Sequence, residues 1–190
     1  MRPYLPFLFA ASLGLLLCGC AESPAKERFT PEPSSGKRSL GEFVDDEKLQ
    51  AIVYSNINKS AMDFSETNIR VHSFKGIVLL TGEIPDEELK HEAGRIAQSV
   101  KGVRQIHNEL QLKSNSTFFA RSNDNALEAK IRVKMLASRD IEGSKVRVVV
   151  EDRVVYLMGM LTREETKVAT NIAANTSGIE RVVRAIDYLD

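Results

Sequence analysis

Two long stretches of this sequence repeat each other, and this repetition constrains the fold more than any other feature. Residues 69–71 and 146–148 are closely similar triplets, and the small and apolar residues that follow them keep their spacing. The matched positions are Val78, Leu80, Gly82, Ala93, Ile96 and Ala97 in the first stretch and Val155, Leu157, Gly159, Ala169, Ile172 and Ala173 in the second, with a single-residue gap before the alanines. Such a repeat indicates two copies of one structural unit.

Both copies show the same order of secondary-structure patterns. Apolar residues at helical spacing come first, then two strand-like runs joined by a tight turn, then a helix with an acidic first turn, then a final strand. In the first copy these patterns cover residues 46–59, 68–73, 77–82, a helix after Pro85, and 103–112; in the second they cover 124–137, 146–151, 154–159, a helix after Thr162, and 179–189, with Asn123 or Asp124 as the first N-cap. The predicted fold class is α+β, with two tandem α-β-β-α-β domains, each having two helices packed on a three-stranded mixed sheet.

The N-terminus has the pattern of a lipoprotein signal peptide over residues 1–19. Its apolar run of about 13 residues would be roughly 20 Å long as a helix, which is short against roughly 30 Å of bilayer hydrocarbon. Residues 17–20, Leu-Cys-Gly-Cys, resemble a lipobox, which implies that Cys20 is the acylated, palmitate-bearing mature N-terminus. Ala21, rather than Asp, follows this cysteine, and in such signals this implies sorting to the outer membrane. An ordinary cleaved signal peptide with an incidental cysteine is the alternative.

The remaining boundaries follow from composition. Residues 20–43 contain three prolines and few periodic apolar positions, which predicts an acylated N-terminus followed by a disordered tether. The first domain is expected at residues 44–114, a linker at 115–121, and the second domain at 122–190. Phe118 and Phe119 suggest the hypothesis that these two rings hold the domains together. A mobile linker with exposed aromatic side chains is the alternative.

The repeat resembles the BON domain family, whose signature is Gly-x-Val-x-Leu-x-Gly, then a helix with Ile-Ala, then Gly-Val and an Asn in the last strand. The first copy carries this signature at residues 76–82, 96–97, 102–103 and 106–108. The second copy has Arg153 in place of the turn glycine and Arg184 in place of the Asn, departures that bear on the hairpin turn rather than on the fold. The resemblance covers nearly the whole chain. It implies a pair of phospholipid-associated domains on an outer-membrane lipoprotein.

The residue inventory indicates a binding module and not an enzyme. The three histidines, His72, His91 and His107, are not at metal-ligand spacing, and the two cysteines lie near the N-terminus. No P-loop, nucleophile elbow or His-Glu-x-x-His motif occurs, so we expect no catalytic residue, metal or cofactor. The formal net charge is zero, which provides no overall field to attract nucleic acid.

The candidate binding site is the helix predicted at residues 124–137, because it carries apolar residues on two faces. Leu127, Ile131 and Met135 form one stripe, and a second apolar set lies largely opposite: Ala126, Ala129, Val133, Leu136 and Ala137. One stripe must pack on the sheet, so the other needs a partner, either the other domain, anionic phospholipid or another protein. Lysines beside an apolar face suit a lipid headgroup boundary, and the resemblance implies anionic-lipid binding through this helix. The predicted lipid-binding residues are Ala126, Lys130, Arg132, Val133, Lys134 and Leu136.

These observations predict a lipid-anchored protein of the outer membrane that faces the periplasm. We expect it to bind anionic phospholipid, either phosphatidylglycerol or cardiolipin, and to support envelope integrity, with the cell-division site as one place of action. The absence of Trp argues for shallow and weak contact that depends on the acyl anchor. The alternative is a non-catalytic adaptor whose domain pair docks on an envelope protein.

Overall fold

The structure, a computed structural model, describes residues 36–113 and 118–190, and in the second stretch it describes side chains from residue 122 onward. The predicted signal peptide, Cys20 and most of the predicted tether lie outside these residues. The side chains of Phe118 and Phe119 also lie outside them, so the hypothesis about these two rings stays a prediction.

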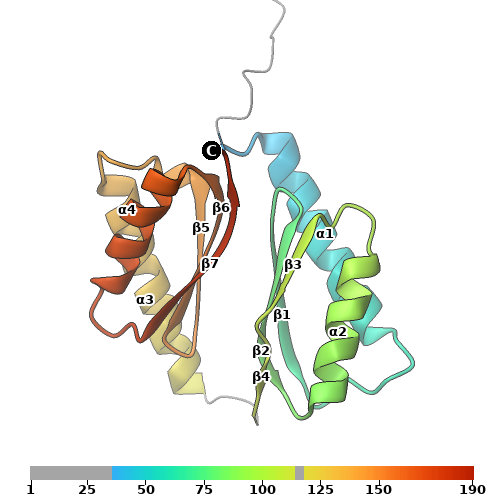
Figure 1. The fold of residues 1–190 in the computed structure, drawn as a ribbon. Coiled ribbons are helices and arrows are strands. Elements are labelled where there is room, and N and C mark those ends of the chain that lie inside the picture. The colour runs from blue at the N-terminus through green and yellow to red at the C-terminus, as the bar shows by residue number, and fades with distance from the viewer. Residues whose placement is uncertain (1–35, 114–117) are drawn as a thin grey trace, which may run out of the picture. The chain divides into compact units, whose positions relative to one another are not determined.

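The first domain places two helices on one face of a mixed sheet (Figure 1). Strand β2 is central, with β1 antiparallel to it on one side and the short strands β3 and β4 parallel to it on the other. The predicted final strand is therefore interrupted between two short pieces. The elements are α1 (Leu40–Asn58), β1 (Asn68–Phe74), β2 (Ile77–Ile84), α2 (Glu87–Ser99), β3 (Gln105–Asn108) and β4 (Gln111–Leu112).

The second domain repeats this arrangement with a continuous last strand. Strand β6 pairs antiparallel with β5 and parallel with β7, and helices α3 and α4 lie on one face of this sheet (Figure 1). The elements are α3 (Phe118–Ala137), a short 3-10 helix (Gly143–Lys145), β5 (Val146–Glu151), β6 (Val154–Leu161), α4 (Arg163–Ala174) and β7 (Arg181–Tyr188). The predicted α+β class and the α-β-β-α-β order are confirmed in both copies.

The first helix of each domain begins earlier than the sequence analysis predicted. Helix α1 starts at Leu40 because Ser39 and Glu42 form a capping box, in which each side chain accepts a hydrogen bond from the other residue's backbone N–H. Residues 40–43, which were assigned to the tether, are therefore helical. Helix α3 starts at Phe118, so the prediction that Asn123 or Asp124 is its N-cap is wrong.

Asp46, inside α1, holds the tip of the first hairpin. It is 3% exposed, and its carboxylate accepts hydrogen bonds from the backbone N–H groups of Lys75 (2.9 Å) and Gly76 (3.3 Å) and from the Ser73 hydroxyl (2.7 Å). Lys75 and Gly76 have φ angles of 49° and 79°, as in the left-handed turns that match the twist of paired strands. The helix therefore supplies an acceptor for turn N–H groups that would otherwise be buried without a partner.

Asp124 does the same for the second hairpin. It is also 3% exposed, and it accepts hydrogen bonds from the backbone N–H groups of Asp152 (2.7 Å) and Arg153 (3.1 Å). These two turn residues have φ angles of 48° and 62°. The second turn thus keeps the geometry of the first, although Arg153 stands where the first copy has a glycine.

Each domain has its own apolar core between helices and sheet. In the second domain Leu127, Ile131 and Met135 are buried, which confirms that this stripe of α3 packs on its own sheet. In the first domain Leu49, Val53 and Ile57 fill the corresponding place, whereas Ile52 on the same helix is half exposed.

A third apolar core lies between the two sheets. Side chains alternate along strands, so the residues that point away from the helices form a second face on each sheet. This core consists of Phe74, Ile77 and Leu79 from the first domain and Val149, Val154, Tyr156, Met158 and Ala185 from the second. The two domains therefore pack sheet against sheet, and each sheet is covered on both faces.

Polar contacts surround this core. Arg70 lies 3.0 Å from a carboxylate oxygen of Glu151, and Arg147 donates to the Ser73 carbonyl oxygen at 3.0 Å. The segment before α1 also contacts the second domain, because the Lys37 ammonium lies 2.6 Å from a carboxylate oxygen of Glu142. These two ion pairs and the hydrogen bond connect residues that are far apart in the sequence and join the two domains.

Candidate functional site

The outward face of α3 is open in the described structure. Val133 and Leu136 are 65% and 63% exposed, although both are large apolar residues. Their neighbours on this face are also exposed: Ala126, Ala129, Lys130 and Ala137. The first domain does not cover this face, because it packs against the opposite side of the second domain's sheet. Of the three partners considered for the second apolar set, the other domain is therefore excluded.

The basic residues on α3 differ in how free they are. Lys130 is exposed and has no acidic partner within salt-bridge distance among the described residues. Arg132 is exposed but lies 2.6 Å from Glu128, one turn earlier on the same helix. The Lys134 ammonium donates to the Thr176 hydroxyl at 2.8 Å and approaches the Asn175 carbonyl oxygen at 3.4 Å. Lys130 is thus the cation most available to a ligand, and Lys134 has a fixed position beside it.

The face as a whole is chemically amphipathic. Val133 and Leu136 offer apolar surface, and Lys130 and Lys134 follow each other at one-turn spacing along one edge of it. Lysine ammonium groups next to exposed aliphatic side chains are typical of helices that lie in a membrane interface. This arrangement offers positive charge and apolar surface to a single partner at the same time.

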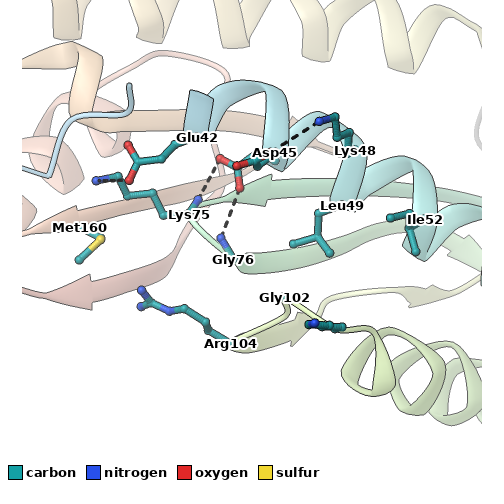
Figure 2. Close-up of a pocket in the computed structure, with 12 residues that line it drawn as sticks. Glu42, Asp45, Lys48, Leu49, Ile52, Lys75, Gly76, Gly102, Arg104 and Met160 are labelled. Carbon is teal, nitrogen blue, oxygen red and sulfur yellow. Dashed lines mark hydrogen bonds and ion pairs between the residues drawn. The ribbon is translucent and has the colours of Figure 1, made fainter. Parts of the chain in front are cut away.

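A groove of about 510 Å³ lies mainly on the first domain, between α1, the β1–β2 turn and the loop before β3, and Met160 of the second domain also lines it (Figure 2). Leu49, Ile52 and Met160 give it apolar walls. Glycines form the backbone at its base, and a Cβ atom on Gly76 would lie 2.7 Å from the Gly102 carbonyl oxygen. This position of the turn therefore requires glycine, because any other side chain would collide with the Gly102 backbone.

The cations of this groove are mostly neutralised by the chain itself. Lys75 lies 3.3 Å from Glu42, and Lys48 lies 3.8 Å from Asp45, as Figure 2 shows. Arg104 pairs with Asp187 of the second domain. An anionic ligand would have to compete with these carboxylates. The open face of α3 is therefore the stronger candidate for binding an anionic partner.

The three histidines lie apart and do not form a site. His72 lies on β1 at the contact between the sheets, where burial and the positive charges of Arg147 and Arg70 lower its pKa to about 3. His91 is exposed on α2, and His107 lies on β3, where partial burial lowers its pKa. In residues 36–113 and 118–190, no group of three or more His, Cys, Asp or Glu side chains is placed to hold a metal ion.

Sequence reasoning missed the contribution of α4. Asn171 and Asn175 are spaced by one helical turn, and together with Lys134 they line a shallow groove between α4 and α3. Their spacing was visible in the sequence, but their proximity to α3 depends on the packing of two helices that are distant in the chain.

No helix in the described part of the chain is both long and apolar enough to cross a membrane.

Two helix-covered sheets packed face to face, with one amphipathic helix face left open, define a tandem α+β protein. The model of the BON domain family matches residues 45–114 and 123–190, and the chain therefore belongs to the BON-domain family.

Similarity to known proteins supports this assignment. The chain is 31% identical over 153 residues to "Outer membrane lipoprotein DolP" of Haemophilus influenzae, covering 80% of this chain and 79% of that protein. It is 32% identical over 152 residues to "21 kDa hemolysin" of Actinobacillus pleuropneumoniae, with coverage of 80% and 78%. It is 26% identical over 155 residues to "Osmotically-inducible protein Y" of Escherichia coli, with coverage of 78% and 75%.

Proposed function

We propose that this protein is an outer-membrane-anchored lipoprotein that faces the periplasm and binds anionic phospholipid through the open face of α3. The anchor and location are supported by the lipobox-like residues 17–20 and by similarity to a protein named as an outer membrane lipoprotein. The lipid contact is supported by one observation above all, the exposure of Val133 and Leu136 beside Lys130, which has no acidic partner among the side chains that the structure describes.

The expected affinity of this face alone is low. A lysine near an anionic surface contributes about 1 kcal/mol, and full burial of a Val or Leu side chain contributes about 1.5–3 kcal/mol, of which a partly inserted side chain gains only part. An acyl chain on Cys20 would keep the domains close to the bilayer and raise their effective concentration there. The acyl anchor and the open face of α3 therefore bind the membrane together. This binding supports the integrity of the cell envelope, including at the division site.

Vesicle co-sedimentation of the fragment Ser34–Asp190 tests the lipid contact without the anchor. This fragment forms one compact unit and contains the described helices and strands and all three apolar cores. We expect it to bind vesicles that contain phosphatidylglycerol and not vesicles of phosphatidylcholine alone. Equal binding to both, or to neither, would contradict the proposal.

Two variants locate the contact on α3. Lys130→Glu should weaken binding to phosphatidylglycerol vesicles roughly 30-fold, since it removes one favourable charge and adds a repulsive one. Val133→Ser combined with Leu136→Ser should weaken it about tenfold by removing exposed apolar surface. Lys59→Glu, the same charge change at an exposed position of the first domain, is the matched control and should have little effect. If the control weakens binding as much as Lys130→Glu, the contact depends on net charge and not on α3.

The adaptor alternative predicts the opposite pattern. A protein partner would be captured from envelope extract by the fragment, and that capture would be lost in the Val133 and Leu136 variant while vesicle binding was absent from the start.

A further inference from the structure

The groove beside α1 has the length and the apolar walls to hold an extended peptide (Figure 2). Its lining runs along α1 from Glu42 to Ile52, about 15 Å of helix, which an extended chain of about five residues also spans. Leu49 and Ile52 give apolar surface at one end, and Met160 gives it at the other. Ile52 is 49% exposed, so this surface is open to a partner.

Lys101 supplies the available positive charge of this groove. Its ammonium has no carboxylate within salt-bridge distance among the described side chains, whereas Lys75 and Arg104 each have such a partner. Lys48 lies 3.8 Å from Asp45, but both side chains are largely exposed, and a surface ion pair of this kind contributes little. A ligand with a single carboxylate therefore matches the groove, and a polyanion would be repelled by its acidic side chains.

The backbone beside this lysine offers two further donors. The N–H groups of Lys101 and Gly102 donate to no acceptor within the described part of the chain, whereas the N–H group of Val103 donates to the Val100 carbonyl oxygen. A Cβ atom added to Gly102 would lie 3.7 Å from Leu49 Cδ1, so these donors lie next to the apolar wall. Successive free N–H groups beside an ammonium are suited to capture the terminal carboxylate of a peptide.

We propose that this groove binds the C-terminal end of an extended polypeptide whose last residue is apolar. The terminal carboxylate accepts hydrogen bonds from the Lys101 ammonium and from the backbone N–H groups of Lys101 and Gly102. The last side chain packs against Leu49 and Ile52, and the preceding residues run along α1 toward Met160. The site lies on α1 and not on α3, so it goes beyond the proposed function.

The other end of the groove favours a peptide over an alkyl chain. Lys75 and Glu42 lie 3.3 Å apart there, and both line the groove. Peptide N–H and carbonyl groups can form hydrogen bonds with such an ion pair, whereas an alkyl tail would cover it and remove its water without replacing those hydrogen bonds.

Peptide titrations test the capture of the carboxylate. The probe is an acetylated five-residue peptide of glycine and alanine that ends in leucine, titrated into the fragment Ser34–Asp190. The free acid should bind at least about tenfold more tightly than the C-terminal amide, the factor that one hydrogen bond to a charged group contributes. Ending the peptide in serine should weaken binding about fivefold by removing apolar contact. The backbone N–H signals of Lys101 and Gly102 should shift on titration with the free acid and not with the amide.

Three outcomes of these titrations would overturn the proposal. Equal binding of the acid and the amide would show that no terminal carboxylate is captured. Absence of binding by both at millimolar concentration would show that the groove is not a peptide site. Tighter binding of octanoate than of the peptide acid would identify a fatty acid as the occupant. All three leave the lipid contact of α3 untouched, because its test uses vesicles and substitutions on another helix.

Substitutions then assign the binding to the groove. Lys101→Glu should remove the difference between acid and amide, and Lys59→Glu, the same charge change at an exposed position outside the groove, should preserve it. Ile52→Ser should weaken binding of the acid about fivefold, whereas Val44→Ser, at a similarly exposed position of α1 outside the groove, should have little effect. Thermal unfolding of each variant confirms that it is folded. A preference for the free acid that survives Lys101→Glu would overturn the proposal.

Discussion

At the residue scale, the two domains solve one problem in the same way. A tight hairpin turn leaves backbone N–H groups for which the paired strands offer no acceptor. In this protein a helix passes close to each of the two turns. Asp46 of α1 and Asp124 of α3 each accept hydrogen bonds from two of these N–H groups. A carboxylate acceptor strengthens such hydrogen bonds, and its removal leaves buried donors unsatisfied.

We predict that Asp124→Ala lowers the free energy of unfolding by about 2–4 kcal/mol, because the N–H groups of Asp152 and Arg153 lose their only side-chain acceptor. Urea denaturation followed by circular dichroism measures the change. Asp45→Ala, an exposed aspartate in α1, is the control and should change stability by less than about 0.5 kcal/mol. A similar small effect at Asp124 would show that the turn does not depend on the helix.

A pair of glycine substitutions tests the first turn. Gly76 has a φ of 79°, and an added Cβ would lie 2.7 Å from the Gly102 carbonyl oxygen, so Gly76→Ala should destabilise the protein by about 1–3 kcal/mol. Gly41 lies in the first turn of α1, and a Cβ added there would lie 3.9 Å from the Ser39 Oγ atom. Gly41→Ala should therefore stabilise the protein by about 0.5–1 kcal/mol. Thermal unfolding of both variants gives the comparison, and a loss of stability at Gly41 would contradict the helix start at Leu40.

At the scale of elements, periodicity predicted most of the fold. The helical spacing of Leu127, Ile131 and Met135 gave the buried stripe of α3, and the repeat gave the order of elements in both domains. The early start of α1 was also present in the sequence, as the Ser39 to Glu42 capping box, but the prolines before it suggested a longer tether.

Other features depend on tertiary packing. Every residue of β2, residues 77–84, is buried, and such a run cannot reveal by itself what covers its second face. The structure shows that the other sheet covers it. In the candidate site, the exposure of Val133 followed from the pattern, whereas the anchoring of Lys134 by Thr176 did not, because it joins residues on either side of a whole sheet-and-helix segment.

The sheet-to-sheet contact yields a prediction at this scale. Met158→Lys places an ammonium at a fully buried position of the apolar third core and should cost several kcal/mol of domain packing. We expect the two domains to separate while each keeps its helices, which would appear as a larger hydrodynamic radius with little change in far-ultraviolet circular dichroism. Val133→Lys, on the open face of α3, should leave the radius unchanged. An unchanged radius for Met158→Lys would argue against the sheet-to-sheet contact.

At the scale of the whole molecule, the contact between the domains places one imidazole group, that of His72, beside two positively charged side chains. His72 lies near Arg70 of its own strand and Arg147 of the second domain, and its environment lowers its pKa from 6.5 to about 3. The group is therefore neutral in the folded protein across the physiological range, and it takes up a proton on unfolding only where the pH lies below about 6.5. Since the folded pKa is the lower one, its contribution to stability is complete above about pH 6.5 and is lost as the pH falls toward 3.

We predict that the free energy of unfolding falls by about 2 kcal/mol more between pH 7.5 and pH 5 in the natural protein than in His72→Gln, which cannot take up this proton. Urea unfolding at several pH values, compared as the difference between the two proteins, cancels other groups such as Glu151, whose pKa is raised by burial and which acts with the opposite sign. Parallel pH profiles would show that His72 is not buried by the contact.

The ion pair between Lys37 and Glu142 determines where the chain before α1 meets the folded domains. Glu142 belongs to the loop directly after α3, and Gly36 lies against the backbone of β6. The segment that leads into α1 of the first domain therefore contacts the second domain first. A force applied to the chain on the N-terminal side of Gly36 would therefore reach the second domain before it reached α1, through the ion pair of Lys37 with Glu142 and the contact of Gly36 with β6.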